Sequence, residues 1–258
     1  MKRFLLRVIP MAVLVLGVIG HLPRSAGQMP DSDAPDKKFE EFDKVTRGAN
    51  VSKGLFTLYQ KEDNVFAEIR PDQMNQPFLC PIAIARGLGM GGHTLNFDEQ
   101  WVIVFKRVND RIQVIRRNVH FTAKPGSPAA KAVETTYTDS ILLAVRIRSI
   151  HPLRQTVLIN LNDIFMTDFA DLGLGHLDTT RSSWNKVKVF PRNVELEVMA
   201  TFGGGRHFGG DAVIDARGNT VAVHYGLCQM PDGGYQPRVA DDRIGYFLTA
   251  VKDFSSDS

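Results

Sequence analysis

The sequence predicts a mainly β protein, an antiparallel sandwich or open barrel with one or two short helices. Apolar and polar residues alternate along several segments from Gly54 onward, and turn-forming pairs such as Asn109-Asp110 separate them. No long segment repeats its apolar residues at the spacing of an α-helix. Strands with one apolar and one polar face, joined by short turns, favour antiparallel sheets.

The clearest strand is Asn193–Phe202. Its apolar set is Val194, Leu196, Val198 and Phe202, and its polar set is Asn193, Glu195, Glu197 and Thr201. Since successive side chains of a strand point to opposite faces, the first set predicts the core and the second the solvent side. Further strands are predicted at Phe56–Tyr59, Asn64–Ile69, Trp101–Val108, Arg111–Arg116, Ile141–Ile147, Thr156–Leu161 and Thr220–Leu227.

Two short helices are predicted. Phe39, Phe42 and Val45 recur at a spacing of three within Asp36–Arg47, which suits a short amphipathic helix with an Asp cap. The second is expected after Asn160 or Asn162, where apolar residues fall near helical spacing.

The N-terminus reads as an export signal over residues 1–27. Basic residues precede the apolar run Val8–Gly20, and the small residues Ser25-Ala26-Gly27 follow it. That run is shorter than the roughly 20 apolar residues of a membrane-spanning helix. We therefore expect a signal peptide (1–27), a linker with a short helix (28–52) and a β-rich accessory domain (53–258), exported to the periplasm or the extracellular space, without a stable membrane span after cleavage.

Removal of the signal changes the charge of the chain. The whole sequence carries 31 Lys and Arg against 28 Asp and Glu, a formal charge of +3. Four basic residues lie in the signal (Lys2, Arg3, Arg7 and Arg24), which leaves 27 basic against 28 acidic residues. A balance near zero argues against nucleic acid as a partner.

Two cysteines, Cys80 and Cys228, remain in the exported chain. An oxidising compartment permits a disulfide between them, and two separate buried thiols fit the sequence equally well.

No motif identifies a catalytic site. Gly87–Gly92 contains G-x-G-x-x-G, but the residues that follow start a helix poorly, so a glycine loop is favoured over a dinucleotide site. The loop Gly203–Gly210 carries His207, and we interpret it as a long connection between strands. The histidines occur in no compact metal-ligand spacing, and Asp241, Asp242, Arg238 and Arg243 fit structural ion pairs.

Several short blocks, taken together in order and spacing, resemble one family. They are Gly54–Thr57, Asp139–Leu142, Asn162–Asp168, Arg181-Ser182, Phe190–Glu195, and a block from Met230-Pro231 through Tyr235–Arg238 to Asp241–Phe247. The stretch Lys53–Phe254 is similar to the N-terminal, non-catalytic region of secreted bacterial zinc-dependent metalloproteases of metzincin-like type, a domain of unknown function.

The resemblance implies a non-catalytic module that assists the folding, shielding or positioning of a protease domain. That domain, in cis or in trans, would carry the zinc-binding motif H-E-x-x-H. The motif does not occur in this sequence, so no catalytic or metal residue and no cofactor is assigned to this chain. The alternative is a stand-alone extracytoplasmic binding module for polysaccharide or peptide.

The resemblance also points to two sets of residues. The block after Met230 suggests a domain junction formed by Tyr235, Pro237, Arg238, Asp241, Arg243, Gly245 and Tyr246. Cys228, within Leu227–Asp232, faintly resembles a cysteine switch, in which a thiolate occupies the catalytic zinc of a protease. The arginine expected before that cysteine is absent, which favours a core or disulfide cysteine.

Overall fold

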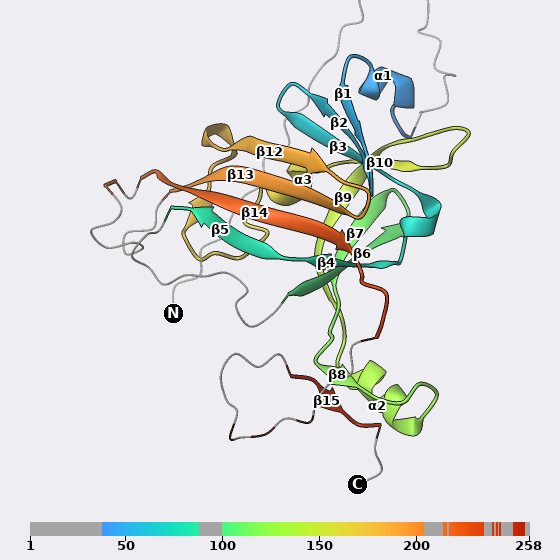
Figure 1. Ribbon diagram of the computed structural model, residues 1–258. Helices are drawn as coiled ribbons and strands as arrows, with labels where there is room; N and C mark the ends of the chain where they lie inside the picture. Colours follow the sequence, from blue (N-terminus) through green and yellow to red (C-terminus); the bar gives the residue numbers. More distant parts are fainter. Residues whose placement is uncertain are drawn as a thin grey trace, which may run out of the picture. The chain divides into compact units, whose positions relative to one another are not determined.

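A computed structural model describes residues 38–87, 100–203, 214–215, 217–234, 239, 241, 243 and 250–255 (Figure 1). The chain divides into two compact units, residues 1–37 and residues 38–258, and the described residues all belong to the second. Strands dominate this unit and form a nearly closed, barrel-like antiparallel sheet, which confirms the predicted fold class. Within the described residues, no helix is long and apolar enough to cross a membrane.

The first half of the unit contains two helices and eight strands. In chain order these are α1 (Phe42–Thr46), β1 (Asn50–Lys53), β2 (Thr57–Lys61), β3 (Asn64–Ile69), β4 (Pro77–Cys80), β5 (Ile82–Arg86), β6 (Trp101–Val108), β7 (Arg111–Arg116), β8 (Phe121–Thr122) and α2 (Pro128–Thr136). A 3-10 turn, η1 (Pro71–Gln73), lies between β3 and β4.

The second half supplies the longest strands. They are β9 (Ser140–Ile150), β10 (Val157–Asn160), β11 (His176–Leu177), β12 (Ser183–Val189), β13 (Asn193–Gly203), β14 (Asn219–Gln229) and β15 (Lys252–Asp253), with the helix α3 (Asn162–Phe165) after β10 and the 3-10 turn η2 (Thr179–Arg181) before β12.

The main sheet has the order β1-β2-β3-β10-β9-β7-β6-β4-β14-β13-β11. β11 and β12 both pair with β13, on the side away from β14. β4 and β5 both pair with β14, on the side away from β13. β4 and β5 come from one apolar run that is divided at Pro81, which has no N–H to donate to a ladder. β8 and β15 form a separate parallel pair (Figure 1).

The two-residue periodicity identified the core correctly. Val194, Leu196, Val198 and Phe202 of β13 are at most 1% exposed and lie in one apolar cluster with residues of the other main-sheet strands. The expected solvent face of β13 is less open than predicted, because Glu197 and Thr201 are only 4% and 5% exposed. Lys186 Nζ of β12 lies 2.9 Å from Glu197 Oε2, and Thr201 Oγ1 donates to the Arg181 carbonyl at 2.8 Å.

The described residues form three α-helices, one more than the upper number expected. α3 lies where the sequence predicted it, and α2 was missed. α1 lies within the predicted Asp36–Arg47 but spans only Phe42–Thr46, and its N-cap is Glu41, which makes no side-chain capping bond, instead of the expected Asp. None of the residues of α2 is buried, so its sequence carries no clear apolar stripe. Its start is marked instead by Ser127, whose side chain accepts a hydrogen bond from the Ala130 N–H, and by Pro128 in the first turn.

α1 covers the outer side of the β2–β3 hairpin. Phe42, Tyr59, Phe66 and Leu158 form a second apolar cluster there. The segment predicted as a linker (28–52) therefore contains the packed helix α1 and most of β1, which pairs with β2. Beside this cluster the carboxylate of Glu68 is 5% exposed and accepts hydrogen bonds from Tyr59 Oη (2.7 Å) and Thr156 Oγ1 (2.6 Å). Burial acts to raise the pKa of Glu68, but these bonds and Arg154 hold it below its ordinary value.

The two edges of the sheet meet along a seam between β1 and β12. At one end the Leu55 N–H donates to the Phe190 carbonyl at 2.8 Å. A Cβ on Gly54 would overlap the Phe190 carbonyl oxygen and the Val189 side chain, so only glycine permits this approach. At the other end, β12 begins beside α3 and the turn between β2 and β3.

At that second end Asn162 joins the two edges through its side chain. Its Oδ1 accepts from the Val65 N–H at 3.1 Å and from Trp184 Nε1 at 3.0 Å. Its Nδ2 donates to the Asp63 carbonyl at 2.8 Å. Side-chain hydrogen bonds therefore hold the seam where the strands do not pair.

We expect Gly54→Ala to lower the free energy of unfolding by about 1–3 kcal/mol, because the added methyl forces the two edges apart. Gly233→Ala is the matched control, since a Cβ at Gly233 meets nothing within 4 Å. Urea denaturation of both variants measures the effect. Equal unfolding midpoints for the two variants would show that the seam is not held at Gly54.

Candidate functional site

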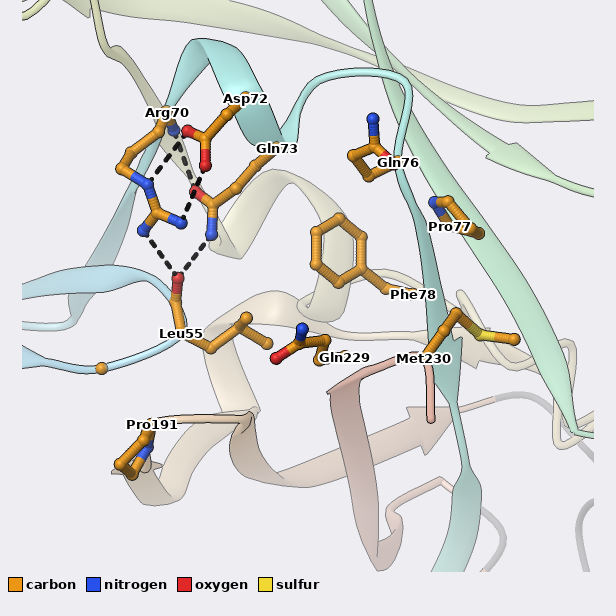
Figure 2. A pocket seen from close by; sticks show the side chains of 11 residues that line it. Leu55, Arg70, Asp72, Gln73, Gln76, Pro77, Phe78, Pro191, Gln229 and Met230 are labelled. Atoms are coloured by element: carbon orange, nitrogen blue, oxygen red, sulfur yellow. Dashed lines mark hydrogen bonds and ion pairs between the residues drawn. The ribbon is translucent and has the colours of Figure 1, made fainter. Parts of the chain in front are cut away.

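A pocket of about 340 Å³ lies at the Gly54 end of the seam (Figure 2). Four separate segments build it: the β1–β2 turn, η1 with the start of β4, the β12–β13 turn, and the end of β14. The lining residues are Gly54, Leu55, Arg70, Asp72, Gln73, Gln76, Pro77, Phe78, Pro191, Gln229 and Met230.

Hydrogen bonds fix the charged wall of this pocket. Arg70 Nε and Nη2 donate to the two Asp72 carboxylate oxygens at 3.1 and 3.3 Å, and Arg70 Nη1 donates to the Leu55 carbonyl at 3.3 Å. Gln73, only 4% exposed, donates to the same carbonyl at 2.5 Å and accepts from the Arg70 N–H at 3.0 Å. Arg70 and Asp72 therefore neutralise each other and shape the wall, and neither presents an unpaired charge to the pocket.

The rest of the described lining is neutral and includes two amides, Gln76 between η1 and β4 and Gln229 at the end of β14. Figure 2 shows the Phe78 ring between Gln76 on one side and Gln229 and Met230 on the other. Phe78 is 3% exposed and packs against Phe56 and Phe105. The side chains of Gln76 and Gln229 make no hydrogen bond within the described part of the chain. Each offers a donor and an acceptor, the complement of a peptide group.

The structure places both cysteines near this pocket as free thiols. Cys228 lies opposite Leu79 in the β14–β4 ladder, so Cys228 and Cys80 point to opposite faces of the sheet. Cys80 is fully buried, and burial together with the nearby Cys228 raises its pKa to about 12. Burial and Glu195 also raise the pKa of Cys228, which disfavours the thiolate that a zinc switch needs.

Of the predicted junction residues, Asp241 and Arg243 are described. Arg243 Nε donates to Asp241 Oδ1 at 2.9 Å and its Nη2 to Asp241 Oδ2 at 2.5 Å, an exposed ion pair between residues two apart. Tyr235, Pro237, Arg238, Gly245 and Tyr246 lie outside the described residues, as does Asp242. Met230, where the junction block begins, lines the pocket.

The other sequence candidates do not converge. Gly87 follows β5, which pairs antiparallel with β14, and residues 88–92 and His207 lie outside the described residues. His224 Nε2 lies 2.5 Å from Glu195 Oε2 on the outer sheet face, and His151 Nδ1 accepts from the backbone of Leu153 and Arg154. Among the described residues, no group of three or more His, Cys, Asp and Glu could hold a metal ion.

Sequence reasoning did not identify the pocket, because its residues come from parts of the chain as distant as Gly54 and Gln229. The local signals available were Pro71 and Asp72, which mark the start of η1, and Pro77, which begins β4. Neither signal indicates that these segments face Pro191 and Met230.

We expect the native protein to expose one slowly reacting thiol, Cys228, while Cys80 reacts only after unfolding. The reason is their burial, which also keeps both thiols protonated at a pH of about 8. Titration with an aromatic disulfide reagent, before and after denaturant, measures this. Cys228→Ser should abolish the native-state reaction. A protein with no titratable thiol even when unfolded would instead contain the Cys80–Cys228 disulfide.

Two family profiles match the chain. Residues 39–87 match the Domain of unknown function (DUF5118), and residues 96–258 match the Domain of unknown function (DUF5117). No curated protein and no solved structure matches the chain. The second profile spans more than half of the sequence, and the chain therefore belongs to the family described as Domain of unknown function (DUF5117).

Proposed function

We propose that this chain is an exported, non-catalytic accessory module that positions a zinc-metalloprotease-like domain, and that the pocket beside Met230 receives a segment of that domain. The observation that carries the proposal is the position of the pocket. Gln229 ends β14, and Met230 begins the block by which the sequence resembles the region that precedes such protease domains. A domain docked at that block would lie beside the pocket.

The chemistry of the pocket supports a polypeptide as its ligand. Its volume of about 340 Å³ is at the small end of the range for ligand pockets. Leu55, Pro77, Pro191 and Met230 supply apolar walls, and the amides of Gln76 and Gln229 can pair with a main-chain N–H and C=O. A peptide segment fits this lining, because an apolar side chain can contact the apolar walls while the peptide groups on either side of it bond to the two amides.

The same pocket is poorly suited to catalysis or to sugar stacking. Among the described residues that line it, the one carboxylate, Asp72, is paired with Arg70, so they offer no separate general acid and general base. The one aromatic ring in the same set, Phe78, is covered on nearly all sides and offers no free ring face to a sugar.

The proposal predicts that the purified chain binds a zinc-metalloprotease catalytic domain of the family it resembles, supplied with its general-base glutamate changed to glutamine to prevent digestion. Replacing both Gln76 and Gln229 with Ala should weaken this binding about tenfold, because two hydrogen bonds of about 0.5–1.5 kcal/mol each are lost. Isothermal titration calorimetry measures the dissociation constants.

Gln113→Ala is the matched control, because Gln113 lies on the outer side of β7, outside the lining of this pocket. It should bind like the parent. If the chain does not bind the catalytic domain, the accessory role is wrong. If the double variant binds as tightly as the parent, the role survives but the pocket is not the docking point.

A further inference from the structure

A second and larger recess, the seam groove, lies at the opposite end of β12. It has a volume of about 860 Å³. One bank is the turn between β2 and β3, with Glu62 and Asp63. The other bank is formed by Thr179, Thr180, Ser182, Ser183 and Trp184. α3 lies between the two banks and supplies Asn162 and Asp163.

The banks of the seam groove are held at a fixed separation. Asn162 bonds to the β2–β3 hairpin through the Asp63 carbonyl and the Val65 N–H, and to β12 through Trp184. Behind them Ile164 and Phe165 of α3 are fully buried in the main core. A ligand would therefore meet a largely preformed site, which reduces the ordering cost of binding.

Trp184 is the aromatic member of the groove. Its Nε1 donates to Asn162 Oδ1 at 3.0 Å, and its ring packs edge-on against Phe165 with 6.5 Å between centroids. These two contacts fix the orientation of the indole. The side chain is only partly buried, so part of its surface is available to the groove. An indole held in this way offers apolar area at little cost in conformational entropy.

The remainder of the lining is rich in hydroxyls and in planar polar groups. Five Ser and Thr residues line the groove, and Gln60, Glu62, Asp63 and Asp163 add amide and carboxylate oxygens. Three of the five hydroxyls already donate within the chain, Thr167 to the Ile164 carbonyl, Thr180 to Asp178 Oδ1 and Ser182 to the Asp178 carbonyl. The Thr179 and Ser183 hydroxyls make no hydrogen bond in the described part of the chain, so each can donate to and accept from a ligand, and each carboxylate oxygen accepts from two directions. Such a surface matches a ligand with many hydroxyl groups of its own.

The charge of the groove selects among such ligands. No Lys or Arg is present among the described residues that line it, whereas three carboxylates are. Burial raises the pKa of Asp163, and the charge of Arg148, which is not part of the lining, acts against that rise. Arg181, between the lining residues Thr180 and Ser182, is engaged with Asp178 and the Arg217 carbonyl. Phosphorylated or uronic-acid polymers would meet unpaired negative charge, which is repulsive.

These features together lead us to infer that the seam groove binds a neutral oligosaccharide. A basic peptide would pair with the carboxylates, but it would make fewer hydrogen bonds to the hydroxyls and less apolar contact with the indole of Trp184. Lys188, exposed on the neighbouring length of β12, also disfavours an approaching basic chain. The inference is independent of the protease-positioning role, which uses the other end of the seam.

The test is fluorescence titration of the purified chain with cellohexaose, chitohexaose and maltohexaose, each up to about 5 mM, a range suited to millimolar affinity. The chain has two tryptophans, and Trp101 is 9% exposed beneath Arg116, so a ligand-dependent change reports mainly on Trp184. We expect at least one hexasaccharide to bind. Trp184→Ala should abolish the signal.

Because Trp184→Ala also removes a seam hydrogen bond, two milder variants are needed, with binding followed by calorimetry. Thr179→Val and Asp163→Asn alter exposed groove residues, and each should weaken binding about threefold or more, the effect of losing one hydrogen bond. Thr138→Val, at an exposed threonine outside the groove, and Gln229→Ala, in the other pocket, should bind like the parent.

The outcomes separate cleanly. Binding of a neutral hexasaccharide that the groove variants weaken and the controls do not would support the inference. It is overturned if none of the three sugars binds, if the groove variants bind like the parent, or if hexalysine binds at the groove while the sugars do not.

Discussion

The structure depends on how the two edges of its sheet are brought together without pairing into a continuous barrel. Unpaired strand edges are exposed to association with other chains, and complete closure would remove them. Here, just beyond the ends of β1 and β12, Gly54 lets the Leu55 N–H reach the Phe190 carbonyl. Farther along the seam, Asn162 replaces the missing backbone ladder with side-chain hydrogen bonds. Lys186 and Lys188 on β12 then protect the edge that stays open.

Both recesses follow from this incomplete closure. Where the edges touch, the turns that carry Leu55 and Pro191 leave a narrow neutral pocket, and the paired Arg70 and Asp72 fix its wall. Where the edges diverge, α3 fills the base of the opening with Ile164 and Phe165 and presents Asn162 and Asp163 outward. A single architectural feature therefore produces two sites of different size and polarity at opposite ends of one strand.

The sequence predicted elements whose faces differ in polarity and missed those whose faces do not. Asn64–Ile69, Trp101–Val108 and Arg111–Arg116 are strands with the predicted bounds, because apolar residues mark their inward positions. β12 was missed although Lys186-Val187-Lys188-Val189 alternates as a strand should, because a register shift between Trp184 and Lys186 breaks the two-residue spacing. α2 was missed because it buries nothing. Glu197 was expected in solvent, but its position opposite β12 covers it. The pocket and the groove were beyond prediction, since each joins side chains that only the closure of the sheet brings together.

The pocket and the seam groove differ in electrostatics, and this difference separates the two ligands proposed for them. Among the described lining of the pocket, the charges are those of Arg70 and Asp72 and cancel within one ion pair, so affinity there must come from apolar contact and neutral hydrogen bonds. The described lining of the seam groove has Glu62, Asp63 and Asp163 and no Lys or Arg, so it repels an anionic ligand, and a neutral ligand must offer many donors. A hydrophobic peptide segment matches the apolar walls and amides of the pocket. In the seam groove the same segment would leave the carboxylates without hydrogen-bond donors. A sugar satisfies the second and gains no aromatic face from the buried Phe78 in the first. One module could therefore hold a protein neighbour and a saccharide at the same time without competition between them.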